Sequence, residues 1–148
     1  MIYKQTVSLK NTNFDQVCNT FHDRKFVNFL TSFQPVKIIS WTGIENDKIA
    51  FFKLWFLGWR DFKVKHSHYT KINDCLSFED TGNVLPLGLT NWNHNHTVKK
   101  DKDNILIIDL LEVKHRNILL GYALFPMLIF PIFIRRILYP LYFYKNKS

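Results

Sequence analysis

The chain has 148 residues, of which 47% are hydrophobic and 16% aromatic, which is enough apolar material for one domain over residues 1–148. Its formal net charge of +8 is compatible with an anionic partner, either nucleic acid or a membrane surface. The basic residues stand in ones and twos along the chain, which argues against a nucleic-acid groove. Two widely spaced cysteines, Cys18 and Cys75, and an N-terminus without an apolar leader predict a cytoplasmic protein with reduced thiols.

The first 35 residues predict one strand and two short helices. Residues 2–9 alternate between two faces, as a strand does. Asn11-Thr12-Asn13 offers helix-capping side chains, and apolar residues then recur at helical spacing over 13–21 and again to about Ser32. Pro35 is expected to end the helical stretch, because the residue before a proline disfavours helical backbone.

The middle of the chain, from residue 36 to residue 113, predicts antiparallel strands joined by turns. The expected strands are 36–44, 49–57, 59–72, 75–81, 89–99 and 105–113. In 59–72, alternation places Val64, His66 and His68 on one face and three lysines, Lys63, Lys65 and Lys71, on the other. Since the lysine face must meet water, we expect both histidines to point inward.

A second histidine pair lies in the segment Trp92-Asn93-His94-Asn95-His96. Alternation on a strand places Trp92, His94 and His96 on one face and the asparagines on the other. This is the densest group of chemically capable side chains in the sequence, and it is the first candidate for a functional site.

The C-terminal part is an apolar run, free of formal charge from residue 118 to residue 134. A membrane-spanning helix needs about 20 apolar residues, and Gly121, Pro126 and Pro131 interrupt this run. We therefore expect a loop to about Pro126 and then a long, mostly buried helix, kinked by Pro140 near its end.

This order of elements is similar to the helix-grip fold of the START-like superfamily, also called SRPBCC, which includes the birch-pollen allergen, lipid-transfer START domains and polyketide cyclase-like proteins. The segments 76–82, 85–87 and 92–96 resemble the pattern F-x-D-x-x…P…W-x-H-x-H of small bacterial ligand-binding SRPBCC proteins. The tail 130–145 resembles that family's last helix, with Lys145 where arginine is usual. The resemblance implies an α+β helix-grip fold, in which a curved antiparallel sheet of about seven strands wraps around a long C-terminal helix and encloses an apolar cavity.

The candidate ligand-binding residues are those expected to face this cavity: Val64, His66, His68, Asp80, Trp92, His94, His96 and Val98. A metal site needs the two histidine pairs together, but the strand 75–81 is expected to separate them by about 10 Å. No carboxylate stands at an obvious completing position, although Asp80 and Asp109 are candidates. We therefore expect no metal, no cofactor and no assigned catalytic residue, and we interpret the histidines as polar groups in an aromatic wall.

The sequence thus predicts a carrier or sensor that binds a hydrophobic or amphipathic small molecule, such as a lipid. One alternative is a cyclase- or hydrolase-like enzyme in which His94 or His96 works with Asp80 or Glu79. Another is peripheral contact with an anionic membrane through the apolar tail and Arg135-Arg136. The oligomeric state is left open.

Overall fold

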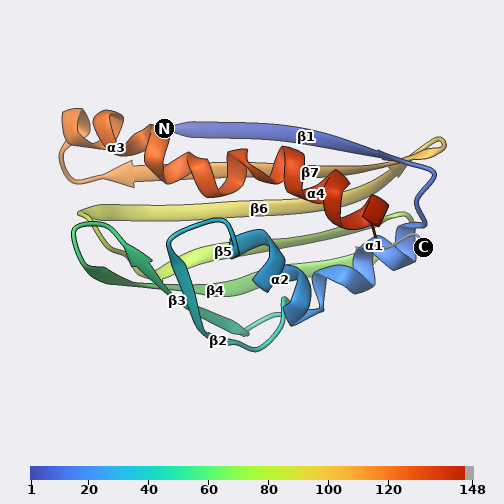
Figure 1. The fold of residues 1–148 in the computed structure, drawn as a ribbon, viewed down its shortest axis with the longest axis horizontal. Helices are drawn as coiled ribbons and strands as arrows, with labels where there is room; N and C mark the ends of the chain where they lie inside the picture. Colours follow the sequence, from blue (N-terminus) through green and yellow to red (C-terminus); the bar gives the residue numbers. More distant parts are fainter. Residues whose placement is uncertain (146–148) are drawn as a thin grey trace.

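A seven-stranded antiparallel sheet forms one layer, and helices pack across one of its faces (Figure 1). The computed structural model describes residues 1–145. The elements in chain order are β1 (Ile2–Lys10), α1 (Phe14–Phe21), α2 (Arg24–Thr31), β2 (Val36–Trp41), β3 (Ile49–Trp55), β4 (Trp59–Ile72), β5 (Cys75–Val84), β6 (Leu89–Asp101), β7 (Asn104–His115), α3 (Ile118–Phe133) and α4 (Arg135–Lys145).

The strand order is β1-β7-β6-β5-β4-β3-β2, so every neighbouring pair from β2 to β7 is a hairpin. The first strand is the exception, because β1 pairs with β7 at the other end of the chain, with Ile2 opposite Glu112 and Lys10 opposite Asn104. This sheet and the helices around it confirm the predicted α+β helix-grip fold.

The two short helices begin where the sequence offers capping side chains. The Asn13 side chain accepts a hydrogen bond from the Gln16 backbone N–H at 3.0 Å, and the Asp23 side chain accepts one from Lys25 at 2.8 Å. Apolar residues at helical spacing on α1, such as Phe14, Val17 and Phe21, are buried.

The C-terminal helix begins earlier than the sequence predicted. The Asn117 side chain caps α3 by accepting a hydrogen bond from Leu120 at 3.0 Å, so the expected loop to Pro126 is wrong. Pro126 and Pro131 lie inside α3, where each removes only one backbone donor. The Ile134 N–H donates to Phe130 at 3.0 Å and the Leu138 N–H to Ile134 at 3.2 Å, so the helical segment continues into α4.

The two halves of this helical segment differ in burial, which corrects the expectation of a mostly buried helix. On α4, Leu138, Tyr139 and Phe143 are buried, whereas α3 leaves Leu119 79% and Ile118 70% exposed. Within residues 1–145, the 28-residue segment Ile118–Lys145 is long and apolar enough to cross a membrane by length and composition, and 17% of its most apolar window is buried.

Two apolar clusters fill the space between helices and sheet. One joins α1, α2 and α4 to residues such as Leu76, Val98 and Ile107. The other joins α3 to residues such as Val64, Trp92 and Leu111. On β6 and β7 the residues between the clusters are His94, His96 and Asp109, so a polar band crosses the sheet where the two clusters meet.

Candidate functional site

The polar band is assembled by the register of five adjacent strands. Cross-strand neighbours place polar side chains side by side on the inner face, in the pairs Gln5–Asp109, Asp109–His96, His94–Asp80 and Asp80–His66. Each of these residues occupies an inward position of its strand, and all except the partly buried Asp80 are buried. The site is therefore built on strands, which hold side chains more firmly than loops do.

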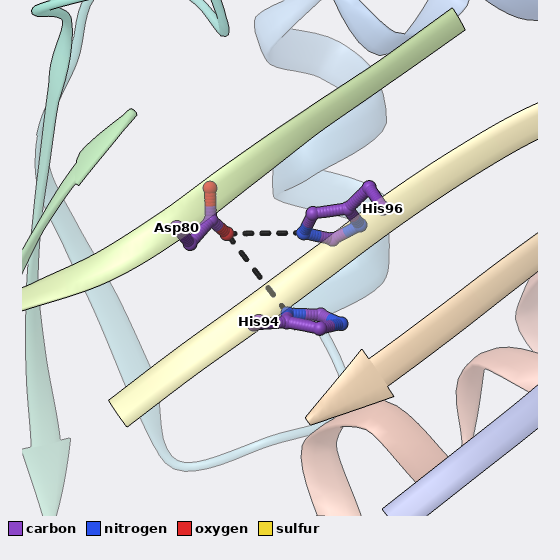
Figure 2. A group of neighbouring side chains, drawn as sticks. All are labelled: Asp80, His94 and His96. Atoms are coloured by element: carbon purple, nitrogen blue, oxygen red, sulfur yellow. Dashed lines mark hydrogen bonds and ion pairs between the residues drawn. The ribbon is translucent and has the colours of Figure 1, made fainter. Parts of the chain in front are cut away.

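Asp80 on β5 lies at the centre of three imidazoles. Figure 2 shows both imidazoles of β6 turned toward the Asp80 carboxylate. His96 Nε2 is 3.0 Å and His94 Nδ1 is 3.9 Å from Asp80 Oδ2. From the other side, His66 Nε2 is 3.0 Å from Asp80 Oδ1. The intervening strand, which was expected to keep the histidine pairs apart, instead supplies the carboxylate that connects them.

Asp109 on β7 is a second, deeper centre, with 0% exposure. Its carboxylate accepts hydrogen bonds from Gln5 Nε2 at 2.9 Å, from His94 Nε2 at 3.1 Å and from the Tyr139 hydroxyl at 3.3 Å. The Arg135 guanidinium lies 3.7 Å from the same carboxylate. These contacts connect β1, β6, β7 and α4 through one buried anion.

The carboxylates and imidazoles of the band shift one another's pKa values. Burial alone would raise the pKa of Asp80 and Asp109, but the histidines around them hold both values well below the usual range. Burial lowers the pKa of His96, but the two carboxylates outweigh it and the value is raised. Burial and the charge on His96 lower the pKa of His94 to about 4. The two carboxylates thus favour the protonated form of His96, and Asp109 also lies beside the guanidinium of Arg135.

A cavity of about 400 Å³ lies above this band, between the sheet and the helices. Its walls are mostly apolar and aromatic, including Phe52, Phe62, Trp92 and Leu128. His66, Asp80, His94, His96 and Arg135 form its polar part. The exposed residues of the lining, Pro35, Trp55, Pro126, Met127 and Phe130, mark where the cavity meets solvent.

Six of the eight sequence-predicted site residues line this cavity: Val64, His66, Asp80, Trp92, His94 and His96. Trp92 packs edge-on against Phe62, with ring centroids 5.1 Å apart, and so forms part of the wall. Val98 points inward but is fully buried in the apolar cluster beneath α1 and is not part of the lining.

His68 lies on the opposite face, so the expectation that it points inward is wrong. Its side chain is 80% exposed and lies 3.0 Å from Glu79 on the outer surface. The cause is a bulge in β4, where the register with β5 shifts between Ser67 and Thr70 and His68 adopts φ of 52°. After this bulge the alternation is reversed, and Tyr69 is the residue that packs against the core.

Four important residues of the site were not assigned to it from the sequence. Gln5 and Asp109 are polar residues at positions where the alternation of their strands otherwise places apolar, inward-facing side chains. This break in the pattern is the signal that could have identified them. Asp109 had been considered only as a metal ligand. Arg135 was expected on the wet side of the tail, but its side chain is 19% exposed and faces Asp109. Tyr139 lies one helical turn after Arg135, on the same face of α4.

The arrangement offers two kinds of chemistry. The His96–Asp80 pair lies within hydrogen-bonding distance inside the cavity, as the enzyme alternative required, and can hold or move a proton. The same nitrogens and carboxylate oxygens can bind a cation, since imidazole and carboxylate are common metal ligands.

No protein-family model and no curated protein matches the sequence. Solved structures do match. A norcoclaurine synthase point mutant from Thalictrum flavum is 15% identical with a TM-score of 0.68, over 100% of this chain and 96% of that one. A START superfamily protein from Mycobacterium smegmatis is 14% identical with a TM-score of 0.59, over 95% and 93% of the two chains.

A nucleoside-diphosphate sugar epimerase from Corynebacterium glutamicum is 20% identical with a TM-score of 0.57, over 79% of this chain. This chain spans only 24% of that epimerase, so the similarity concerns one part of a larger protein. At these identities the structural matches establish the fold. The chain therefore has the helix-grip fold of the START-like, or SRPBCC, proteins, as its sequence resemblance predicted.

Proposed function

We propose that this protein binds a hydrophobic or amphipathic small molecule in the cavity between the sheet and the C-terminal helix. The observation that carries the proposal is a cavity of about 400 Å³ with aromatic walls and one polar region. Ligand sites typically enclose about 300–1,000 Å³ and combine apolar walls with a few polar groups. The superfamily binds hydrophobic ligands, which supports the same conclusion.

The distribution of side chains suggests how such a ligand would lie. Its apolar body would contact Phe52, Phe62 and Trp92, and a polar group would reach Asp80 or His66. A ligand that offers a hydrogen-bond donor suits Asp80 best, because this carboxylate is the acidic group of the cavity lining and accepts hydrogen bonds.

The test uses the intact protein and a cavity-filling variant. Native mass spectrometry followed by denaturation and extraction is expected to release a co-purified apolar molecule. A fluorescent fatty acid should bind the stripped protein, and Ala50→Phe should weaken this binding by at least about 10-fold, since Ala50 is 1% exposed and lines the cavity. Ala123→Phe, on the exposed surface of α3, is the matched control. Equal binding by both variants would contradict the proposal.

A second candidate is acid–base catalysis on a molecule bound in the same cavity. It is favoured by the His96–Asp80 contact of 3.0 Å and by the raised pKa of His96, which keeps a proton available. One structural neighbour, norcoclaurine synthase, was solved in complex with dopamine and hydroxybenzaldehyde. Incubation with aromatic amines and aldehydes tests this reading. Turnover should be lost in His96→Gln while the far-UV spectrum is kept, and turnover equal to wild type would refute it.

A third candidate, contact with an anionic membrane, is favoured by exposed apolar residues on α3 and in the turn between β3 and β4. Leu119 is 79% and Leu57 80% exposed, and the exposed cations Lys114 and Arg116 precede α3. When phosphatidylserine vesicles are sedimented, the wild-type protein should be found in the pellet and the Leu119→Glu variant in the supernatant. A protein that stays in the supernatant would exclude this candidate and leave the cavity proposal intact.

A further inference from the structure

Two histidines and one carboxylate converge in the polar part of the cavity. Asp80, His94 and His96 each offer one ligand atom, and these atoms lie within 4.8 Å of one another. We propose that these three residues bind a divalent transition-metal ion of the zinc type, with an open coordination position toward the cavity. This site does not depend on the proposed small-molecule function, so either can fail alone.

The distances between the ligand atoms suit a tetrahedral metal. Bonds of 2.0–2.1 Å in a tetrahedron place neighbouring ligand atoms about 3.3 Å apart. His96 Nε2 lies 3.0 Å and His94 Nδ1 lies 3.9 Å from Asp80 Oδ2, on either side of this value. All three side chains come from the adjacent strands β5 and β6, so the site needs no contribution from the displaced His68.

The outer nitrogens of the two histidines are positioned as metal-bound histidines usually are. His94 Nε2 and His96 Nδ1 both lie 3.1 Å from Asp109 Oδ1, while their other nitrogens face Asp80. A carboxylate behind each imidazole fixes the ring and makes the inner nitrogen a better ligand. Hydrogen bonds from Gln5 and Tyr139 fix the orientation of the Asp109 carboxylate.

The outer atoms of the cluster make orienting contacts, which leaves Asp80 Oδ2 and the inner imidazole nitrogens to face an ion. Asp80 Oδ1 lies 3.0 Å from His66 Nε2, and His96 Nδ1 lies 3.1 Å from Asp109 Oδ1. His66, on the far side of Asp80, is placed to orient the carboxylate as a positioning residue.

The ligand types restrict which ion fits. Two imidazoles and one carboxylate suit zinc or ferrous iron better than calcium or magnesium, which prefer oxygen ligands throughout. Three protein ligands with one open position is the arrangement of catalytic rather than structural zinc sites. Because all three ligands line the cavity, the open position can take water or a polar atom of a bound molecule.

The test is metal titration of the untagged full chain after treatment with a chelator. Isothermal titration with Zn²⁺ at about pH 8, where imidazoles are available as ligands, should give one ion per chain with micromolar or tighter affinity. With Co²⁺, we expect the visible absorption of a four- or five-coordinate ion. Failure to bind Zn²⁺, or the spectrum of hydrated Co²⁺, would overturn the proposal without any variant.

Variants locate the ion. Asp80→Asn and His96→Ala should each weaken Zn²⁺ binding by at least about 100-fold, and Asp109→Asn by about 10-fold, as expected for a supporting residue. His68→Ala, an exposed histidine paired with Glu79, should leave the affinity unchanged. Undiminished binding in Asp80→Asn would overturn the site. If Asp80→Asn and His96→Ala fail to fold, the Co²⁺ spectrum of the wild-type protein decides whether the metal site exists.

Discussion

Asp109 combines complete burial with a negative charge, which is costly unless every neighbour compensates it. Gln5, His94 and Tyr139 donate hydrogen bonds to it, and Arg135 lies beside it. Loss of this charge would leave the imidazolium of His96 and the guanidinium of Arg135 without their shared counterion.

We therefore expect Asp109→Asn to reduce the free energy of unfolding by about 3–5 kcal/mol, as when one partner of a buried ion pair is removed. Urea denaturation monitored by tryptophan fluorescence measures this loss. Asp61→Asn is the control, because the Lys53–Asp61 pair is largely exposed and worth at most about 1 kcal/mol. Equal losses in the two variants would show that the buried network contributes no special stability.

Because of two histidines in the site, the free energy of unfolding is expected to pass through a maximum as the pH changes. The pKa of His94 is lowered to about 4 by burial, against about 6.5 in the unfolded chain, so its contribution is present above about pH 6.5 and is lost as the pH falls toward 4. The pKa of His96 is raised by Asp80 and Asp109, so its contribution is full below about 6.5 and is lost as the pH rises.

Together these two residues place the maximum of the free energy of unfolding near pH 6.5. His94 causes the decline below this pH and His96 the decline above it, each by at most about 1.4 kcal/mol per pH unit. Urea midpoints measured across the pH range in the presence of a chelator test this. In His94→Asn the decline between pH 6.5 and about 4 should become shallower. A wild-type stability that stays level over that interval would contradict the assignment.

At the scale of single elements, the bulge in β4 determines which histidine enters the site. His68 holds φ of 52°, a left-handed conformation that glycine adopts freely and β-branched residues resist. The bulge reverses the alternation after Ser67, turning Tyr69 toward His22 and the core.

We expect His68→Val to lower the free energy of unfolding by about 1–2 kcal/mol relative to His68→Gly. Both variants remove the same contact with Glu79, so their difference isolates the backbone conformation. Thermal unfolding of the two proteins side by side provides the comparison. If valine is tolerated as well as glycine, β4 is regular in solution and His68 points inward.

At the scale of the whole molecule, one cysteine reports on global unfolding. Burial raises the pKa of the Cys18 thiol to about 11, and the side chain is 1% exposed in the core beneath α1. Cys75 is exposed at the start of β5. Thiolate is the reactive form, so Cys18 is protected both by its protonation and by its burial.

At about pH 8 a thiol reagent should therefore modify Cys75 quickly and Cys18 more than about 1,000-fold more slowly, because Cys18 reacts only through unfolding. A Cys75→Ser variant isolates the slow reaction, and denaturant should remove the difference in rate. Comparable rates in the folded protein would mean that the helical layer opens locally rather than with the whole domain.

The sequence predicted the sheet and the two short helices because the strands alternate and the cap Asn13 is explicit, but it placed the start of the C-terminal helix too late. Alternation identified His66, His94 and His96, and Asp80 was a candidate from the family resemblance. It failed at His68 because one extra residue in a strand reverses every later side chain. It missed Gln5 and Arg135 because their partner, Asp109, becomes visible only when β1, β7 and α4 are brought together.

The pairing of β1 with β7 has a consequence for how the protein is made. Every other strand pair is a hairpin, which can form as soon as its second strand has been synthesised. The first strand must wait until residues 104–115 have been synthesised, because its partners, from Asn104 to Glu112, lie near the other end of the chain. During synthesis β1 therefore joins the sheet last. Until then its backbone N–H and C=O groups have no strand partner, and a chaperone that binds extended segments would act there.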